Sequence, residues 1–94
     1  MPKINDKMLR KDIEKLLLTH KNLTHLPVEI VQLTNLKELG LSNNKLTHLP
    51  IEIGQLIQMT KLDLYNNELI HLPVEIRQLT LLTELNLSNN QIIK

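Results

Sequence analysis

The 94-residue sequence contains no cysteine, alanine, phenylalanine or tryptophan, and Tyr65 is its only aromatic residue. Without cysteine, the protein has no disulfide framework, no thiolate nucleophile and no cysteine-ligated metal site. With a single ring, its core must close without the aromatic side chains that supply much of the buried area in most domains. Because 22 residues are Leu and 10 are Ile, branched aliphatic side chains are expected to fill that core.

An excess of charge and long hydrophobic runs are missing as well. Eleven basic and ten acidic residues leave a net charge of +1, which favours neither nucleic acid nor an anionic membrane. No apolar run approaches the about 20 residues of a membrane span, and the charged first residues do not form a secretory signal. We therefore expect a cytoplasmic protein, although a bacterial effector exported by another route would look the same.

Few features of the sequence suggest catalysis. Gly40 and Gly54 are its only glycines, so it has no Gly-rich phosphate loop. Ser, His and Asp residues, which can form a catalytic set, are present. However, we expect the serines and the histidines to lie on separate edges of a shallow surface and therefore not in one active site. Nucleic-acid binding would also need stacking aromatic residues, which the sequence lacks. The sequence predicts neither an enzyme nor a nucleic-acid-binding protein.

What the sequence does contain is a repeat of 23 residues. His-Leu-Pro starts at positions 25, 48 and 71, and Asn-Asn starts at positions 43, 66 and 89. This period divides the chain into units 13–35, 36–58, 59–81 and a partial 82–94, with the pattern L-x-x-L-x-L-x-x-N-x-L-x-x-L-P-x-x-I-x-x-L-x-x. The apolar slots of this pattern hold 24 of the 32 Leu and Ile residues, so the repeat accounts for the unusual composition.

With this pattern the sequence resembles the leucine-rich repeat proteins, in the 23-residue class with Leu-Pro-x-x-Ile that occurs in bacterial and protist proteins and in Ras-group-related repeats. The resemblance covers residues 13–94. It implies an α/β solenoid of three full repeats and a partial fourth, with a short parallel β-sheet on the concave side and short helices or 3₁₀ turns on the convex side. It also implies a non-catalytic module that binds a protein partner.

The spacing within each unit agrees with that architecture. The L-x-L segment has the alternation of a strand, so Leu16 and Leu18 and their equivalents every 23 residues are expected to point inward and to stack in columns. Pro27, Pro50 and Pro73 suit the first position of a helix, and a Glu two residues later favours the positive end of a helical turn. We predict short helices or 3₁₀ turns over 28–34, 51–57 and 74–80.

The second asparagine of each pair is predicted to be structural. Asn44, Asn67 and Asn90 would form an internal ladder whose amides bond backbone groups where each strand ends. The first unit has Lys21 in this slot, so its turn should be held less well.

The two ends of the sequence depart from the repeat. Residues 1–12 are predicted to form a helical cap over the first strand, with Asn5 or Asp6 at its start. After the fourth strand, Leu85, Leu87 and Ile92 would be covered on one side only, next to an unpaired strand edge. Because such edges recruit other strands, an alternative role is self-association through this edge, as a structural unit or as a fragment of a longer array.

In leucine-rich repeats the outward residues of the strands form the concave face, where ligands commonly dock. Carried onto this sequence, the resemblance assigns partner binding to Leu17, Thr19, Glu38, Gly40, Ser42, Lys61, Asp63, Tyr65, Glu84, Asn86 and Ser88. Lys15, Glu38, Lys61 and Glu84 alternate in sign, which fits neutralisation between neighbouring strands.

Tyr65 stands among small hydroxyl side chains in this set, beside the open position of Gly40. Tyrosine is enriched at binding hot spots, so Tyr65 and Asp63 are predicted to be the centre of the binding surface. The alternative is that Tyr65 is a solitary exposed tyrosine.

His25, His48 and His71 are expected in one column, about one strand spacing apart. Imidazole is a common metal ligand, so three such rings could in principle hold zinc or nickel. A metal site needs ligands that converge on one ion, whereas a straight column makes its rings diverge. No metal or other cofactor is therefore predicted, and these histidines are the candidates for the metal alternative.

Overall fold

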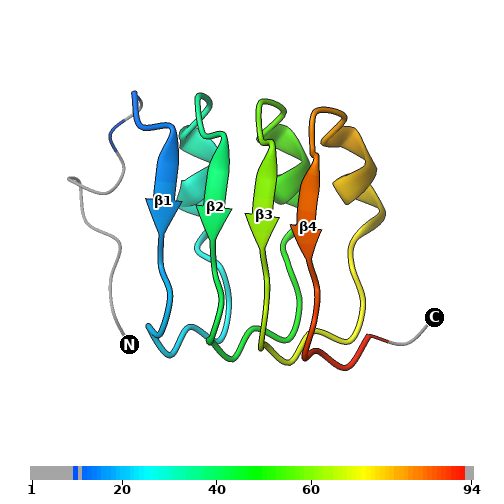
Figure 1. The fold of residues 1–94 in the computed structure, drawn as a ribbon. Coiled ribbons are helices and arrows are strands. Elements are labelled where there is room, and N and C mark those ends of the chain that lie inside the picture. Colours follow the sequence, from blue (N-terminus) through cyan, green and yellow to red (C-terminus); the bar gives the residue numbers. More distant parts are fainter. Residues whose placement is uncertain (1–9, 11, 93–94) are drawn as a thin grey trace.

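The computed structural model describes Arg10 and residues 12–92, which form short strands that alternate with 3₁₀ helices (Figure 1). The strands are β1 (Lys15–Leu17), β2 (Glu38–Gly40), β3 (Lys61–Asp63) and β4 (Glu84–Asn86). The helices are η1 (Val28–Gln32), η2 (Ile51–Gln55) and η3 (Val74–Gln78). The predicted helical cap over 1–12 lies almost entirely outside the described residues.

The strands form one parallel sheet in the order β1-β2-β3-β4, with the three helices on one side of it (Figure 1). The register follows the 23-residue period, so that Lys15 pairs with Glu38, Glu38 with Lys61, and Lys61 with Glu84. Each repeat is thus one turn of a solenoid, and the predicted α/β solenoid is confirmed. We call the side of the sheet that faces away from the helices the strand face; it is the predicted concave face.

The core lies between the sheet and the helices and is built from columns of equivalent side chains. Leu39 and Leu62 are each 1% exposed, and Met59 replaces leucine in its slot at 0%. The column of Leu23, Leu46 and Leu69 is buried to the same degree. Burial of one such aliphatic side chain contributes about 1.5–3 kcal/mol, so these columns are the main source of stability.

The convex-side elements are 3₁₀ helices that end two residues earlier than predicted. Each proline precedes the first helical residue instead of occupying it: Pro27 has an extended ψ of 135°, and its carbonyl accepts the first helical bond from Ile30 N–H at 3.2 Å. After Gln32 the backbone turns inward at Leu33 (φ −85°, ψ 67°), because Leu33 is fully buried. The other two units repeat this geometry.

The sheet is covered unevenly along its length. Leu85 of β4 is 40% exposed, although its equivalents Leu39 and Leu62 are 1% exposed. Leu87 and Ile92 pack against the core but remain partly exposed. Leu81 is 54% exposed. Within the described residues, the fourth strand is therefore covered on one side only, as predicted, and the exposed Leu81 and Leu85 belong to this part of the chain.

Candidate functional site

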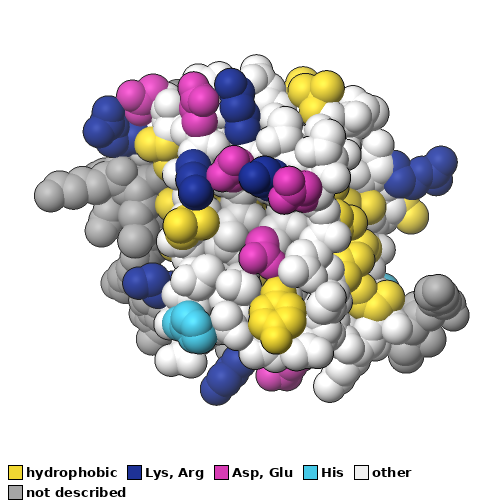
Figure 2. Space-filling model, in the orientation of Figure 1, with side chains coloured by type: hydrophobic (Ala, Val, Ile, Leu, Met, Phe, Trp, Pro, Cys, Tyr) yellow, Lys and Arg dark blue, Asp and Glu magenta, His cyan; other side chains and the backbone are white. Residues whose placement is uncertain are grey.

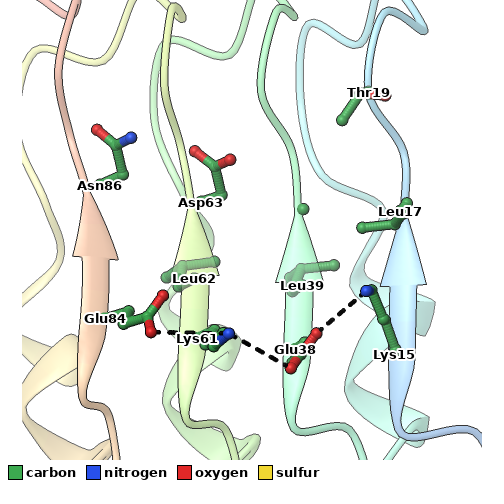
Figure 3. A pocket seen from close by; sticks show the side chains of 11 residues that line it. Lys15, Leu17, Thr19, Glu38, Leu39, Lys61, Leu62, Asp63, Glu84 and Asn86 are labelled. Carbon is green, nitrogen blue, oxygen red and sulfur yellow. Dashed lines mark ion pairs between the residues drawn. The ribbon is translucent and has the colours of Figure 1, made fainter.

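The strand face carries a shallow depression of about 280 Å³ that crosses all four strands (Figure 3). It is lined by Lys15, Leu17, Thr19, Glu38, Leu39, Gly40, Lys61, Leu62, Asp63, Glu84 and Asn86. Small-molecule sites usually enclose about 300–1,000 Å³, so this open hollow suits a surface feature of another macromolecule better than an enclosed substrate.

Most of the predicted binding residues meet in this depression. Ser42, Tyr65 and Ser88 are not among the lining residues, whereas Lys15, Leu39 and Leu62 are. Ser42 is only 9% exposed and offers little surface to a partner. Tyr65, one of the two residues predicted as the centre, therefore lies outside the hollow, and Gly40 and Asp63 lie within it.

A row of ion pairs runs along one side of the depression, across the four strands (Figure 3). Lys15 Nζ lies 3.4 Å from Glu38 Oε2, and Lys61 Nζ lies 3.9 Å from Glu38 Oε1 and 3.6 Å from Glu84 Oε1. Figure 2 shows the same row as alternating basic and acidic side chains. The partners are at least one-third exposed, so each pair is worth at most about 1 kcal/mol and mainly cancels charge on this part of the face.

Next to this row, three strands carry Leu17, Gly40 and Asp63 side by side. Leu17 is 57% exposed, and its Cδ2 lies 2.7 Å from the point that a Cβ on Gly40 would occupy. The leucine side chain therefore lies over the glycine, and a larger residue at position 40 would displace it. Because Gly40 has no side chain, Leu17 fills the space above it and presents an apolar surface beside the acidic Asp63.

Local hydrogen bonds orient the polar residues beyond this apolar surface. Asp63 Oδ1 accepts the Tyr65 N–H at 3.0 Å, and Asn86 Oδ1 accepts the Ser88 N–H at the same distance. The Tyr65 hydroxyl accepts a bond from Asn89 Nδ2 at 3.3 Å. The first two bonds join residues i and i+2, and an Asp or Asn two residues before a turn residue is the sequence signature of such bonds.

The asparagines of the predicted ladder lie beneath the edge of the strand face. Asn67 Nδ2 donates to the carbonyls of Leu41 and Leu64 at 2.9 and 3.2 Å, and Asn67 Oδ1 accepts the Leu46 N–H at 3.1 Å. Asn44 and Asn90 make equivalent bonds in their own repeats. Each amide thus ties the backbone of one turn to the turn before it, just beyond the strands.

The first repeat turns the chain differently because Lys21 occupies the ladder slot. In the later repeats only Asn43, Asn66 or Asn89 takes a positive φ, near 60°. The first turn uses two such residues, His20 at 55° and Asn22 at 56°. Histidine and asparagine tolerate this left-handed region better than bulky residues do, and the turn borrows Asn44 Oδ1 as acceptor for the Lys21 N–H at 3.0 Å.

The three histidines of the metal alternative are exposed and lie before the convex-side helices. His25 Nδ1 is 3.2 Å from the Thr24 hydroxyl and His48 Nδ1 is 3.1 Å from the Thr47 hydroxyl, so each of these rings bonds its own neighbour. Within the described part of the chain, no three or more His, Asp or Glu side chains are grouped to hold a metal ion.

Comparison with known proteins agrees with this architecture. A family model described as a leucine-rich repeat matches residues 34–92. The chain belongs to the leucine-rich repeat family. No curated protein matches the sequence. Among solved structures, the repeats are similar to a leucine-rich repeat protein of Leptospira interrogans, with 48% identity over 97% of this chain and a TM-score of 0.92.

This leucine-rich repeat chain spans only 24% of the length of the Leptospira protein that it matches. Leucine-rich repeat proteins generally act in protein–protein interaction. The matched structure is described as a leucine-rich repeat protein. Across Arg10 and residues 12–92, no helix has the length and apolarity to cross a bilayer.

Proposed function

We propose that this chain is a non-catalytic protein-binding module that receives its partner on the strand face. The observation that carries the proposal is the contrast between repeated and varied positions. The core slots and the Asn ladder are nearly the same in every repeat, whereas the outward position of Leu17, Gly40, Asp63 and Asn86 differs on every strand. Stability does not require that variation, so it is available for recognition.

Photo-cross-linking tests which face binds. A photoreactive p-benzoylphenylalanine in place of Leu17 on the strand face is compared with the same residue in place of Ile51 on η2. The two positions are matched, because Leu17 is 57% and Ile51 is 60% exposed. We expect a covalent adduct with a partner protein from position 17 only; adducts from position 51 alone, or equally from both, contradict the proposal.

Self-association through the edge beside β4 is the second candidate, favoured by the exposure of Leu81 and Leu85 there. A parallel strand with an open edge can pair with another strand, and exposed leucines add apolar area to such a contact. Sedimentation of the wild type and of Leu87→Asp tests this role. A larger species that Leu87→Asp abolishes supports it, and a monomer at high concentration contradicts it.

A further inference from the structure

The depression on the strand face contains one carboxylate that has no ion pair among the described residues. Its two lysines, Lys15 and Lys61, are engaged by Glu38 and Glu84 at 3.4–3.9 Å. Within Arg10 and residues 12–92, the Tyr65 N–H is the one hydrogen-bond partner of Asp63, at its Oδ1 atom, which leaves Oδ2 open to an incoming donor. Its negative charge is therefore the excess charge of the depression.

The surroundings of Asp63 define the length and the character of a complementary side chain. Leu17, Gly40 and Asp63 occupy one register position on three neighbouring strands, so Leu17 and Asp63 are about 9–10 Å apart at Cα. Figure 3 shows Leu17 directed toward β2 and the carboxylate of Asp63 on β3, beyond the ion-pair row. The Leu17 side chain covers Gly40, so an apolar surface lies directly beside the acidic group on this face.

A long side chain with an aliphatic stem and a cationic head complements an exposed leucine beside a carboxylate, because such side chains lay the stem on apolar surface and keep the head at a polar partner. Arginine fits better than lysine. Its planar guanidinium donates two parallel hydrogen bonds to a carboxylate and stacks on aromatic rings. Tyr65, 38% exposed, follows Asp63 by two residues, and its N–H donates to the Asp63 carboxylate at 3.0 Å.

We propose that the strand face binds an arginine on an extended segment of the partner protein, with its aliphatic stem against the exposed Leu17 side chain and its guanidinium on Asp63. The proposal rests on the proposed protein-binding function and names the chemistry of its ligand. Lys15 and Lys61 do not compete with this arginine for Asp63. Their ion pairs with Glu38 and Glu84 hold them about two residues away from it along the strands.

Selection from a random-peptide phage library on the immobilised wild-type chain tests this. We expect arginine to be enriched among the selected peptides. The tightest peptide is then synthesised twice, with arginine and with citrulline, which has the same shape but no charge. Citrulline is expected to lower the affinity about tenfold or more, because a charged hydrogen-bonded pair is lost.

The matched protein variants are Asp63→Asn and Glu29→Gln. The asparagine keeps an oxygen for the Tyr65 N–H, so thermal unfolding should remain that of the wild type, whereas affinity for the arginine peptide should fall about tenfold and affinity for the citrulline peptide should not. Glu29→Gln removes an equal charge from η1 on the opposite side and should leave both affinities within about twofold, since surface charges at that distance are screened.

The outcomes separate this proposal from the one on which it rests. Peptides that bind without arginine and lose affinity when Gly40→Leu displaces the Leu17 side chain would overturn the arginine proposal and keep protein binding on the strand face. Arginine peptides insensitive to Asp63→Asn would overturn it as well. Peptides that are unaffected by any substitution on this face would overturn both proposals.

Discussion

The interior of the solenoid and its strand face follow opposite rules, although they alternate residue by residue along the same strands. Inward, Leu16, Leu39 and Leu62 are identical side chains in one column, and each is at least nine-tenths buried. Outward, the next position carries Leu17, Gly40 and Asp63, which share neither size nor charge. The buried leucines therefore fix the register of the strands, and the outward side chains can vary independently of it.

This separation has an energetic basis. Each inward leucine contacts its equivalents in neighbouring repeats, so a change there affects two interfaces at once. The outward residues contact mainly one another and solvent, and the ion-pair row between Lys15 and Glu84 consists of partners that are at least one-third exposed. Stability is concentrated inside, and substitutions on the strand face can change recognition at little cost to folding.

The largest expected effect comes from truncating an inward leucine. Leu62→Ala should lower the free energy of unfolding by about 2–5 kcal/mol, because the side chain is 1% exposed and its removal leaves a cavity between two repeats. Leu85→Ala is the matched control in the same slot of the fourth repeat. Because Leu85 is 40% exposed, its replacement should lower the free energy of unfolding clearly less than Leu62→Ala does. Urea unfolding measures both values. Equal losses would contradict the account of an open edge at β4.

The repeat and its strands could be predicted because periodicity alone specifies them. The L-x-L segments, the Asn slot and the convex-side turns recur every 23 residues, and stacking places equivalent residues in register. The helices were predicted two residues too long. The sequence pattern marks Leu33 as an inward residue, but it does not show that the backbone must leave the 3₁₀ conformation before Leu33 can be buried.

The site was less predictable, because its shape depends on contacts between non-repeating residues. That Leu17 lies over Gly40 follows from a rotamer and from the absence of a Cβ one strand away. The second carboxylate oxygen of Asp63 stays without an ion pair because the neighbouring lysines pair with two glutamates instead. Tyr65 was predicted from its residue type and its outward position beside Gly40, and neither reveals that it lies outside the depression.

The two glycines test the same comparison between interior and strand face, with an expected effect of intermediate size. A Cβ on Gly54 would lie 2.7 Å from the backbone carbonyl of Glu75, where η2 and η3 approach closely. A Cβ on Gly40 would meet the far end of the exposed Leu17 side chain, which can rotate away. Neither glycine has a positive φ, so backbone strain does not enter.

Gly54→Ala should therefore lower the free energy of unfolding by about 1–3 kcal/mol, since the helices must separate. Gly40→Ala should change it by less than about 0.5 kcal/mol, because the exposed Leu17 side chain that covers Gly40 can rotate into solvent. Thermal unfolding of the two variants measures the difference. A larger loss for Gly40→Ala would show that the strand face is packed as rigidly as the convex side.

The smallest expected effect is on the ion-pair row. Lys61→Gln removes the cation that contacts both Glu38 and Glu84, yet Lys61 is 49% exposed, so the free energy of unfolding should fall by only about 0.2–1 kcal/mol. The loss should shrink at high ionic strength, which screens exposed charges, and Lys45→Gln, at an exposed lysine outside the row, should cost less still. Urea unfolding at low and high salt measures these differences. A salt-independent loss as large as that of Leu62→Ala would mean that the strand face stabilises the sheet, and the division between a repeated interior and a free surface would then fail.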